Sequence, residues 1–533
     1  MVKKLLAFTL ALLLLATSLP VFAETFSSTK ISEDSNLRTD RRPIPVGFYS
    51  PEANKTFVCW MGANCDAVVK EYNHSTGTWT SDKIVGDSPF TDKHNYPSML
   101  RGPDDRIYMF YGCHNSTMRM TVSPNPLSIS GTWSDGYINE AAKASYPAPV
   151  LTSDDKFYVF YRETRQSNGH SDDRPYSFVK SSDNGKTWTK RTIIDPYPRS
   201  DNLTEIYNGK VTYEPAHDGQ KAKIHISWTI CGGGPGTHAH ATYGEHVYYA
   251  YLDPSNDHMY SVDGRDLGTT INNSEMDSYC KVLDTGSTYN AHKAGLQISV
   301  HYRNNGYPLV IFNRSGVGYS SATWNGSSWV IRTITSSESE PRELEKFGPD
   351  SFKAYRTSGT YVYVHRTTDG GNSWTQETSL NVGQNLSRVY VINNHHPDAK
   401  LLITEAGDDS ITVPNRDVFI AKSTSAYDPW YEPTGGSTPT PTATPTPTPT
   451  PTIPPSGSNL ALNKPVTFSS EQVGNEASHA VDGDTVARWS AQVFPQWINV
   501  DLGSVYTVNR MEVAPYMDRA YQFKVEVSTD GTN

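Results

Sequence analysis

The chain has 533 residues, and its 46 basic and 56 acidic side chains give a formal net charge of −10. Lysine and arginine form no stripe, which argues against nucleic acid or an anionic membrane surface as a partner. Five cysteines are too few and too sparse for a disulfide framework. The 32 tyrosines and 11 tryptophans suit carbohydrate binding, because such rings stack on sugars, although β-rich folds are also rich in tyrosine.

Residues 1–23 have the three parts of a secretory signal peptide. Lys3 and Lys4 precede an apolar run from Leu5 to Ala16, and Val21-Phe22-Ala23 is a small-residue cleavage pattern. About a dozen apolar residues cannot span a bilayer, which needs roughly 20. We therefore expect cleavage after Ala23, a mature chain with net charge −12 once both lysines are removed, and a secreted protein.

Residues 24–432 show almost no helical periodicity and contain short alternating apolar runs instead. Runs of this kind, separated by Gly, Asp and Asn turns, indicate an all-β repeat architecture. They occur at residues 57–62, 106–112, 156–163, 223–230, 246–253, 307–313, 360–366 and 400–406. We expect the segment 24–432 to form a single β domain.

Two segments share the pattern Ser/Thr-x-Asp-x-Gly-x-x-Trp: SSDNGKTW at 181–188 and TTDGGNSW at 367–374. The pattern resembles the Asp-box, or BNR repeat, of sialidase-like β-propellers, in which Asp caps a hairpin turn and Trp packs between blades. Weaker copies end at Trp79 and Trp329. At about 40 to 50 residues per blade, the two good boxes are about four blades apart, and we expect a seven-bladed β-propeller.

The composition changes at Pro433. Residues 433–457 alternate Pro and Thr and predict an extended linker, because this pattern favours neither strand nor helix. Residues 458–533 resemble the discoidin, or factor V/VIII type C, domain through AVDGD at 480–484, Arg488-Trp489 and DLG at 501–503. The resemblance implies a carbohydrate-binding jelly-roll. Because only about half of the family's length is present, we expect a truncated module, a partial β-sandwich.

Polar side chains recur at matching places in two successive repeats. His94 lies in HNYP before one repeat, and His114 follows that repeat's FYG strand. Tyr146 lies in YPAP before the next repeat, and Arg162 ends its FYVFYR strand. Binding and catalytic residues gather on loops held by a rigid scaffold, so we expect these four side chains to share a site.

The runs HNYPSML, FYGCHNSTMRM, YPAPV, FYVFYRE and VYYAYLDPSNDHMYSVDG resemble the BNR-repeat family that includes the ulvan-lyase type of polysaccharide lyases, over about residues 85–270. The resemblance implies β-elimination in an acidic, uronate-containing polysaccharide. It implies that His94 and Tyr146 share the acid and base roles and that Arg162 neutralises a uronate carboxylate. The residues implied at the substrate are His114, Asn95 and Tyr213.

These residue types suit β-elimination on general grounds. The C5 proton of a uronide is acidic because it lies next to the carboxylate, and an enolate-like dianion develops as it leaves. A guanidinium stabilises that charge. A base takes the proton, and a phenol or imidazole returns one to the leaving O4. The sequence does not decide which of His94 and Tyr146 is the base.

A second group, Cys231, His240, His246 and Cys280, is a candidate structural zinc site. Thiolate and imidazole ligands suit tetrahedral zinc, and the resemblance adds that related lyases carry a structural metal. The spacing fits no standard zinc motif, so a Cys231–Cys280 disulfide is the alternative. We expect no organic cofactor.

Two other functions remain open. A sialidase-like glycoside hydrolase would share the Asp-boxes, but it needs three arginines around a carboxylate together with a Tyr/Glu pair and an Asp. Its arginine motif is matched only by Arg42-Pro43-Ile44-Pro45. The other alternative is a non-catalytic glycan-binding propeller. The leading hypothesis is a secreted, monomeric polysaccharide lyase whose polymer the sequence does not name.

Overall fold

The computed structural model divides the chain into two units, Met1–Pro439 and Thr440–Asn533. The predicted signal peptide and linker lie outside the described residues, in which no helix is long and apolar enough to cross a membrane. The described residues are 24–35, 42–88, 92, 94–167, 170–199, 203–217, 219–232, 244–286, 296–338, 343–406, 416–424, 459–484, 487–491, 496–504 and 513.

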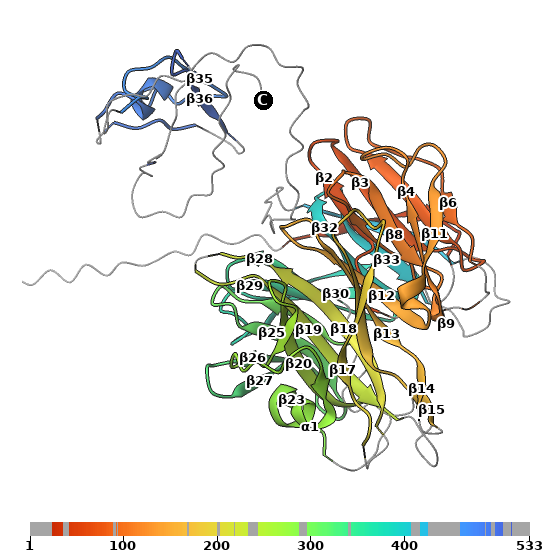
Figure 1. The fold of residues 1–533 in the computed structure, drawn as a ribbon. Helices are drawn as coiled ribbons and strands as arrows, with labels where there is room; N and C mark the ends of the chain where they lie inside the picture. Colours follow the sequence, from red (N-terminus) through yellow and green to blue (C-terminus); the bar gives the residue numbers. More distant parts are fainter. Residues whose placement is uncertain are drawn as a thin grey trace, which may run out of the picture. The chain divides into compact units, whose positions relative to one another are not determined.

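The first unit is built of antiparallel sheets that follow one another along the chain (Figure 1). One contains β2 (Gly47–Ser50), β3 (Lys55–Met61), β4 (Ala67–Asn73) and β5 (Thr78–Trp79), with β6 (Lys83–Gly86) beside β4. The next contains β7 (Ser98–Arg101), β8 (Ile107–Tyr111), β10 (Met118–Val122) and β11 (Ser134–Ile138). A third contains β12 (Ala144–Leu151), β13 (Phe157–Glu163), β16 (Tyr176–Ser181) and β17 (Thr189–Asp195), extended by β9 (His114–Ser116) and β22 (Ile271–Asn272).

Further sheets follow with the same antiparallel order. The first has β18 (Glu205–Glu214), β19 (Lys223–Cys231), β20 (Glu245–Asp253) and β21 (His258–Tyr260), with β23 (Lys281–Leu283) beside β20. The second has β24 (Ser299–Tyr302), β25 (Pro308–Arg314), β26 (Gly318–Trp324) and β27 (Trp329–Thr335). The third has β28 (Glu343–Gly348), β29 (Ser351–Ser358), β30 (Tyr361–Thr367) and β31 (Thr375–Asn381).

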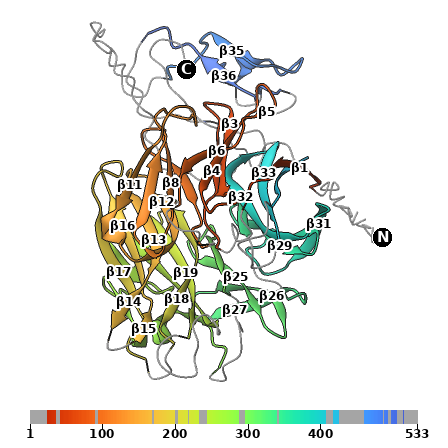
Figure 2. The same cartoon turned by 90° about the vertical axis from the view of Figure 1, so that its right-hand side faces the viewer.

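The last sheet joins the two ends of this unit. It contains β32 (Leu386–His396), β33 (Ala399–Glu405), β34 (Val418–Ser423) and the N-terminal β1 (Phe26–Ser32), which pairs with β34. A parallel contact between Asn393 of β32 and Phe48 of β2 links it to the first sheet. In Figure 2 the cyan strands accordingly return beside the red ones. Each alternating run expected from the sequence lies on a strand, and the all-β prediction is confirmed.

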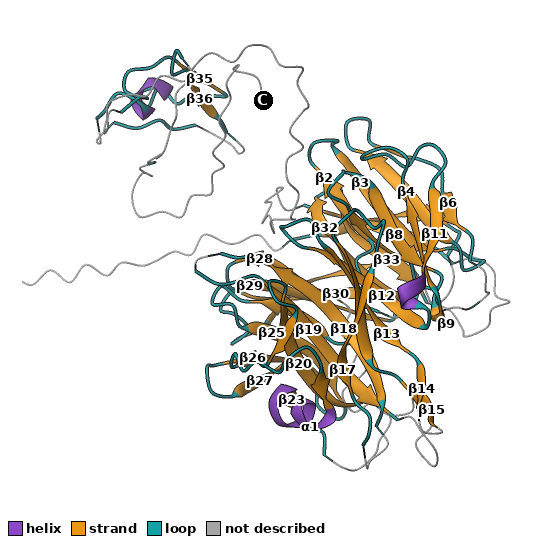
Figure 3. Cartoon of the chain, in the orientation of Figure 1, coloured by secondary structure: helices purple, strands orange, loops and turns teal. Residues whose placement is uncertain are grey.

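Among the described residues of this unit, helical structure is limited to short turns (Figure 3). They are η1 (Asn139–Ala141), α1 (Asn273–Glu275) and the π-helical turn η2 (Met276–Cys280). A hairpin of β14 (Arg165–Ser167) and β15 (His170–Asp173) extends from the third sheet. The apolar core lies in clusters along and between neighbouring sheets, with Trp60 and Trp228 among its largest buried side chains.

Both Asp-boxes form the hairpin turns that their sequence predicts. Asp183, between β16 and β17, accepts hydrogen bonds from the backbone N–H groups of Lys186 at 3.1 Å and Thr187 at 2.9 Å. Asp369, between β30 and β31, accepts one from Ser373 at 3.0 Å. Each turn contains a glycine in the left-handed region, where a side chain would be strained: Gly185 with φ 75° and Gly371 with φ 91°.

The expected spacing of the two boxes is wrong. Their sheets are three apart in the chain order of sheets, not about four. The intervening chain is lengthened by the β21–β23 segment, which holds the helical turns α1 and η2. Insertions of this kind carry no alternating pattern, so the average repeat length cannot reveal them.

The second unit contains a two-stranded antiparallel sheet, β35 (Val466–Phe468) and β36 (Ile498–Val500), and the 3₁₀ turn η3 (Ala477–Ala480). The indole of Trp489 donates to the carbonyl of Ser470 at 3.0 Å, and Trp497 is exposed. These described residues show strand pairing expected of a β module without displaying a complete sandwich.

Candidate active site

Tyr146 is placed by an irregularity in β12. The pairing of β12 with β13 shifts between Ser145 and Ala148, so that Tyr146 and Pro147 form a bulge. Tyr146 has φ 63°, a conformation that costs energy for a bulky residue. Bulges of this kind redirect a side chain out of the regular alternation, and they are common beside active sites.

His94 and His114 meet next to this bulge. His94 precedes β7, whereas His114 begins β9, a strand that leaves its own sheet and pairs with Ser145 of β12. The two imidazole rings stack with centroids 4.2 Å apart. Their centroids lie 6.4 Å (His94) and 5.8 Å (His114) from that of Tyr146. The predicted two-repeat pattern therefore does bring its histidines and tyrosine together.

Asp92 orients both histidines. Its Oδ1 lies 2.7 Å from His94 Nδ1 and its Oδ2 lies 2.7 Å from His114 Nδ1. Burial opposes ionisation of Asp92, but the hydrogen bonds from His114 and His94 hold its pKa well below the usual range. A carboxylate that engages both Nδ1 atoms fixes the ring orientations and leaves each Nε2 for other partners.

Two arginines stack on the face of Tyr146 and on that of Tyr207, which lies in β18. The guanidinium carbon of Arg162 lies 4.6 Å from both ring centroids. That of Arg42 lies 4.5 Å from the Tyr146 centroid and 4.6 Å from the Tyr207 centroid. All four side chains are buried. The attraction between a guanidinium group and the face of an aromatic ring becomes stronger when water is excluded.

Arg162 has no exposed surface, and its guanidinium faces Tyr146, Tyr207 and Glu205. Burial of a cation is costly unless such neighbours compensate its charge. Burial lowers its pKa, but the facing Tyr146, Tyr207 and Glu205 outweigh this and raise it, so Arg162 stays charged. The buried positive charge of Arg162 makes the region beside Tyr146 favourable for negative charge.

The positive charge of the arginines changes the pKa of the Tyr146 phenol. Burial alone would raise its pKa, but Arg162 and Arg42, supported by Arg174, outweigh burial and lower the pKa below that of an ordinary tyrosine. For Tyr207 burial wins, and its pKa rises. The pKa values of the two phenols are therefore shifted in opposite directions, and Tyr146 is the one that ionises more readily.

His114 is held close to its neutral form. Burial is the main cause that lowers its pKa, and the positive charge of Arg162 adds to this against the opposing hydrogen bond to Asp92. The imidazole side chains of His94 and His114 are 24% and 16% exposed, so the pair lies at the accessible side of the cluster.

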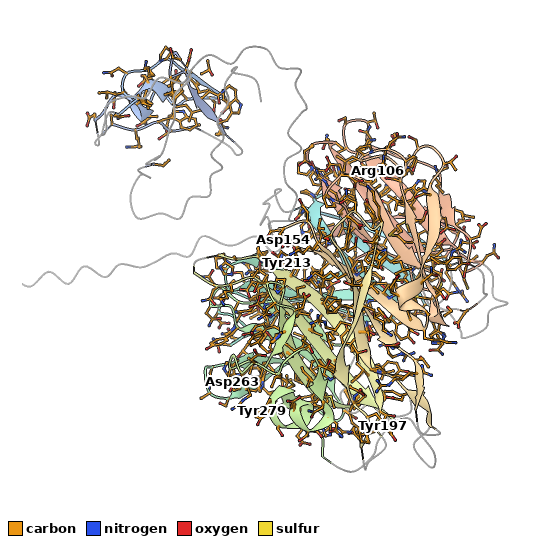
Figure 4. All side chains as sticks on the ribbon, in the orientation of Figure 1. Arg106, Asp154, Tyr197, Tyr213, Asp263 and Tyr279 are labelled. Carbon is orange, nitrogen blue, oxygen red and sulfur yellow. The ribbon has the colours of Figure 1, made fainter. Side chains whose placement is uncertain are left out.

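The other two implied substrate residues lie in different surroundings. Asn95 is buried next to His94 and donates to the hydroxyl of Ser88 at 2.7 Å. Tyr213 lies at the far end of β18 from Tyr207, and its hydroxyl is 2.7 Å from that of Ser153 in the β12–β13 turn. Figure 4 shows Tyr213 next to Asp154 of that turn. The structure thus separates Tyr213 from the histidine cluster.

The expected metal ligands are not gathered among the described residues. Cys231, His246 and Cys280 form no group of potential ligands there, and His240 lies outside them. Both thiols are free and buried, which rules out the alternative disulfide in this structure, and burial raises the pKa of each. His246 accepts a hydrogen bond from the backbone of Thr285 at 3.1 Å. The zinc site stays a prediction, and no step below depends on it.

Four residues of the cluster were missed at these roles by the sequence reasoning: Asp92, Arg42, Arg174 and Tyr207. Arg174 is buried and lies 3.5 Å from the carboxylate of Glu205. Asp92 could have been found, because an acidic residue two positions before a candidate histidine is a local signal. Arg42 and Tyr207 reach the site from distant segments and leave no such signal.

Comparison with known proteins identifies the family to which this chain belongs. Residues 55–337, more than half of the chain, match the BNR repeat-containing family. The chain belongs to this family. Residues 479–533 match the NedA-like, galactose-binding domain, which confirms the discoidin-type resemblance of the C-terminal segment.

Two curated relatives confirm the resemblance to ulvan lyases. An ulvan lyase of Alteromonas sp. (strain LOR) is 22% identical over 399 residues, which cover 66% of this chain and 79% of that protein. Ulvan Lyase-PL25 of Pseudoalteromonas sp. (strain PLSV) is 23% identical over 403 residues, which cover 66% of this chain and 78% of that protein.

Solved structures agree in fold. One described as a new family of polysaccharide lyase, PL25-ulvanlyase, superposes with a TM-score of 0.60 at 18% identity, covering 74% of this chain and 96% of that one. A second, bound to -[GlcA(1-4)Rha3S]-, gives 0.59 at 18% identity over 74% and 97%. These likenesses support an all-β, propeller-like fold for the first unit.

Proposed function

We propose that this protein is a secreted polysaccharide lyase that cleaves a uronate-containing, ulvan-like polysaccharide by β-elimination. The observation that carries the proposal is Tyr146, a strained and buried phenol that two guanidiniums drive towards ionisation, beside two histidines oriented by one carboxylate. The names of the curated relatives, and the glucuronate-containing oligosaccharide bound to a structural neighbour, support this substrate class.

In this proposal Tyr146, as a phenolate, takes the C5 proton of the uronate. His94 returns a proton through Nε2 to the leaving O4, and the charged Asp92 on Nδ1 stabilises its protonated form before transfer. His114 holds a sugar hydroxyl. Arg162 is fully buried, so it does not reach the substrate from the protein surface. Its charge acts through space on Tyr146 and on the developing dianion.

The scaffold proposed for this chemistry is a seven-bladed propeller. It is supported by the succession of four-stranded antiparallel arrangements and by the last of them, in which β1 completes β32–β34. We further propose that residues 1–23 direct secretion and that the C-terminal galactose-binding-like segment holds the enzyme on its polymer.

Product chemistry tests the reaction class. β-Elimination leaves a C4–C5 double bond conjugated with the carboxylate, so incubation with ulvan should raise ultraviolet absorbance in step with new reducing ends. Glycosaminoglycans and pectins serve as parallel substrates. New reducing ends without this absorbance would show hydrolysis and exclude the lyase.

A sialidase-like hydrolase is the second candidate because the structure brings Arg42, Arg162 and Arg174 close to the same tyrosine. Three arginines around a carboxylate are what that reaction requires. Here, however, two of them stack on tyrosine rings, and Arg174 approaches Glu205. Release of sialic acid from a sialoglycan would favour this candidate, and its absence together with unsaturated uronate products would remove it.

A further inference from the structure

A second cluster of imidazole and carboxylate groups lies where the last sheet of the first unit meets the first sheet. His74 directly follows β4, whereas His396 ends β32 and Asp398 lies in the tight turn before β33. Figure 2 shows these two sheets next to each other. The rings of His74 and His396 have centroids 3.9 Å apart, and Tyr49 and Tyr72 enclose the His74 ring.

His74 contains a buried polar atom to which no described residue makes a hydrogen bond. Its side chain is 3% exposed, and its Nε2 lies 2.8 Å from the hydroxyl of Thr56. Its Nδ1 is buried and makes no hydrogen bond with any described residue. An imidazole nitrogen with a lone pair is a ligand for metal ions.

The carboxylate of Asp398 lies beyond hydrogen-bonding distance of both rings. The backbone N–H of Asp398 donates to His396 Nδ1 at 3.2 Å, and a metal ion at this nitrogen would replace that hydrogen bond. Asp398 Oδ2 lies 3.9 Å from His74 Nδ1 and 3.6 Å from His396 Nδ1. Tetrahedral zinc, with ligands ~2.1 Å away, holds them ~3.4 Å from one another. The two distances from Asp398 are within about 0.5 Å of this value, and all three ligand atoms lie within 4.8 Å of one another. Asp92 differs, because at 2.7 Å from both histidines its carboxylate already makes hydrogen bonds.

We propose that His74, His396 and Asp398 bind a divalent transition-metal ion of the zinc type, with water as the fourth ligand. Two imidazoles and one carboxylate suit such ions. Asp398 is 47% exposed, which gives water access, and the only ammonium group paired with it among the described residues, Lys422 at 3.7 Å, approaches the other oxygen, Oδ1. The ion would join the first and last sheets, so the proposal concerns closure of the fold and does not depend on the proposed reaction.

The test is a difference in bound zinc. After removal of metals with EDTA, the full chain is titrated with zinc and its content is measured by calorimetry and elemental analysis. Asp398→Asn and His74→Ala should each bind one equivalent less than the parent protein. A zinc ion at the predicted Cys231 site would change every total but not this difference.

The matched control is His258→Ala. His258 pairs with Asp266 at 3.0 Å on the surface but belongs to no three-residue group of ligands. It should keep the zinc stoichiometry of the parent protein.

Asp398→Asn alters a half-exposed turn residue, so it decides the question if His74→Ala fails to fold. Zinc should also raise Tm by a few degrees in the parent and less in Asp398→Asn. Unchanged stoichiometry and Tm response in Asp398→Asn would overturn the proposal.

Discussion

At the scale of single residues, the candidate site depends on different surroundings that give two tyrosines different pKa values. Tyr146 and Tyr207 are stacked on the same two arginines, yet the pKa of one is lowered and that of the other is raised. Pairs of titratable groups whose acidities are pushed apart are a mark of acid–base sites. This difference selects Tyr146 rather than Tyr207 as the proposed base.

Replacing Tyr146 by Phe removes the hydroxyl and keeps the ring between the arginines. If Tyr146 is the base, kcat for unsaturated product should fall by about 10²–10⁴-fold with an unchanged circular dichroism spectrum. Tyr213→Phe is the matched control, because its hydroxyl contacts Ser153 in a distant turn and its loss should leave the rate close to that of the parent. A Tyr146→Phe enzyme of near-parental rate would remove this residue from the mechanism.

The pH profile reports the influence of the arginines. A phenolate base is lost as the pH falls through its pKa, so the rate should decline on the acid side, at a pH below that expected for an ordinary tyrosine. Arg42→Gln withdraws one of the two stacked charges and should raise the pKa of Tyr146, moving the acid limb to higher pH. An acid limb at the same pH in both enzymes would contradict the assignment.

At the scale of elements, strand irregularities and strand exchange assemble the site. The bulge in β12 turns Tyr146 out of alternation, and β9 crosses from one sheet to the next to bring His114 beside it.

The end of β18 that is remote from Tyr207 contains a buried hydrogen-bond network. There Glu214 is buried between His217 at 2.8 Å and His225 at 2.9 Å, and His225 contacts the hydroxyl of Tyr249 at 2.7 Å.

This network predicts a pH-dependent contribution to stability. Burial opposes ionisation of Glu214, but hydrogen bonds and nearby charge, led by His225, lower its pKa from 4.5 to about 2. A carboxyl with a depressed folded-state pKa stabilises the protein above its unfolded value and loses that contribution as the pH falls from about 4.5 towards about 2. Glu214→Gln should therefore lower the unfolding free energy by roughly 1–3 kcal/mol at pH 7.

Urea denaturation of both proteins at pH 7 and at pH 3 measures this effect. The difference between parent and Glu214→Gln should be larger at pH 7 and should shrink at the lower pH. A constant difference across this range would show that the lost hydrogen bonds matter but the ionisation of Glu214 does not.

At the scale of the whole molecule, the first unit is held together by its two ends. The N-terminal β1 completes the sheet of β32–β34, and Glu24 beside it pairs with Lys353 and, at 3.0 Å, with Lys400. The Glu24 side chain is 1% exposed. Removal of one partner from a buried ion pair is costly because the remaining charge is left without compensation.

Glu24→Ala should accordingly destabilise the fold by about 1–3 kcal/mol, moderated because Glu377 and Glu345 still face the two lysines. Glu33→Ala is the matched control, since Glu33 pairs with Lys30 at the exposed surface and its loss should leave the denaturant midpoint close to that of the parent protein. The measurement is the denaturant midpoint of each variant. Equal midpoints for the two variants would show that the contacts of Glu24 at the chain ends contribute no more to stability than a surface ion pair does.

The sequence alone determined the strands, the Asp-box turns, the family resemblance and the local pairing of His94, His114, Tyr146 and Arg162. Alternation with period 2 and capped turns are local properties that neighbouring residues establish. The site pattern was visible because its members recur at matching positions of successive repeats.

The remaining members of the cluster depend on contacts between segments that are distant in the sequence. Arg42 and Tyr207 meet Tyr146 from remote segments, Tyr213 points to a different turn, and His74 meets His396 across the closing sheets. Contacts between distant segments are set by how sheets pack and where bulges fall, and no local pattern encodes them. The lowered pKa of Tyr146 has the same origin, because it arises from charges that folding buries beside the ring.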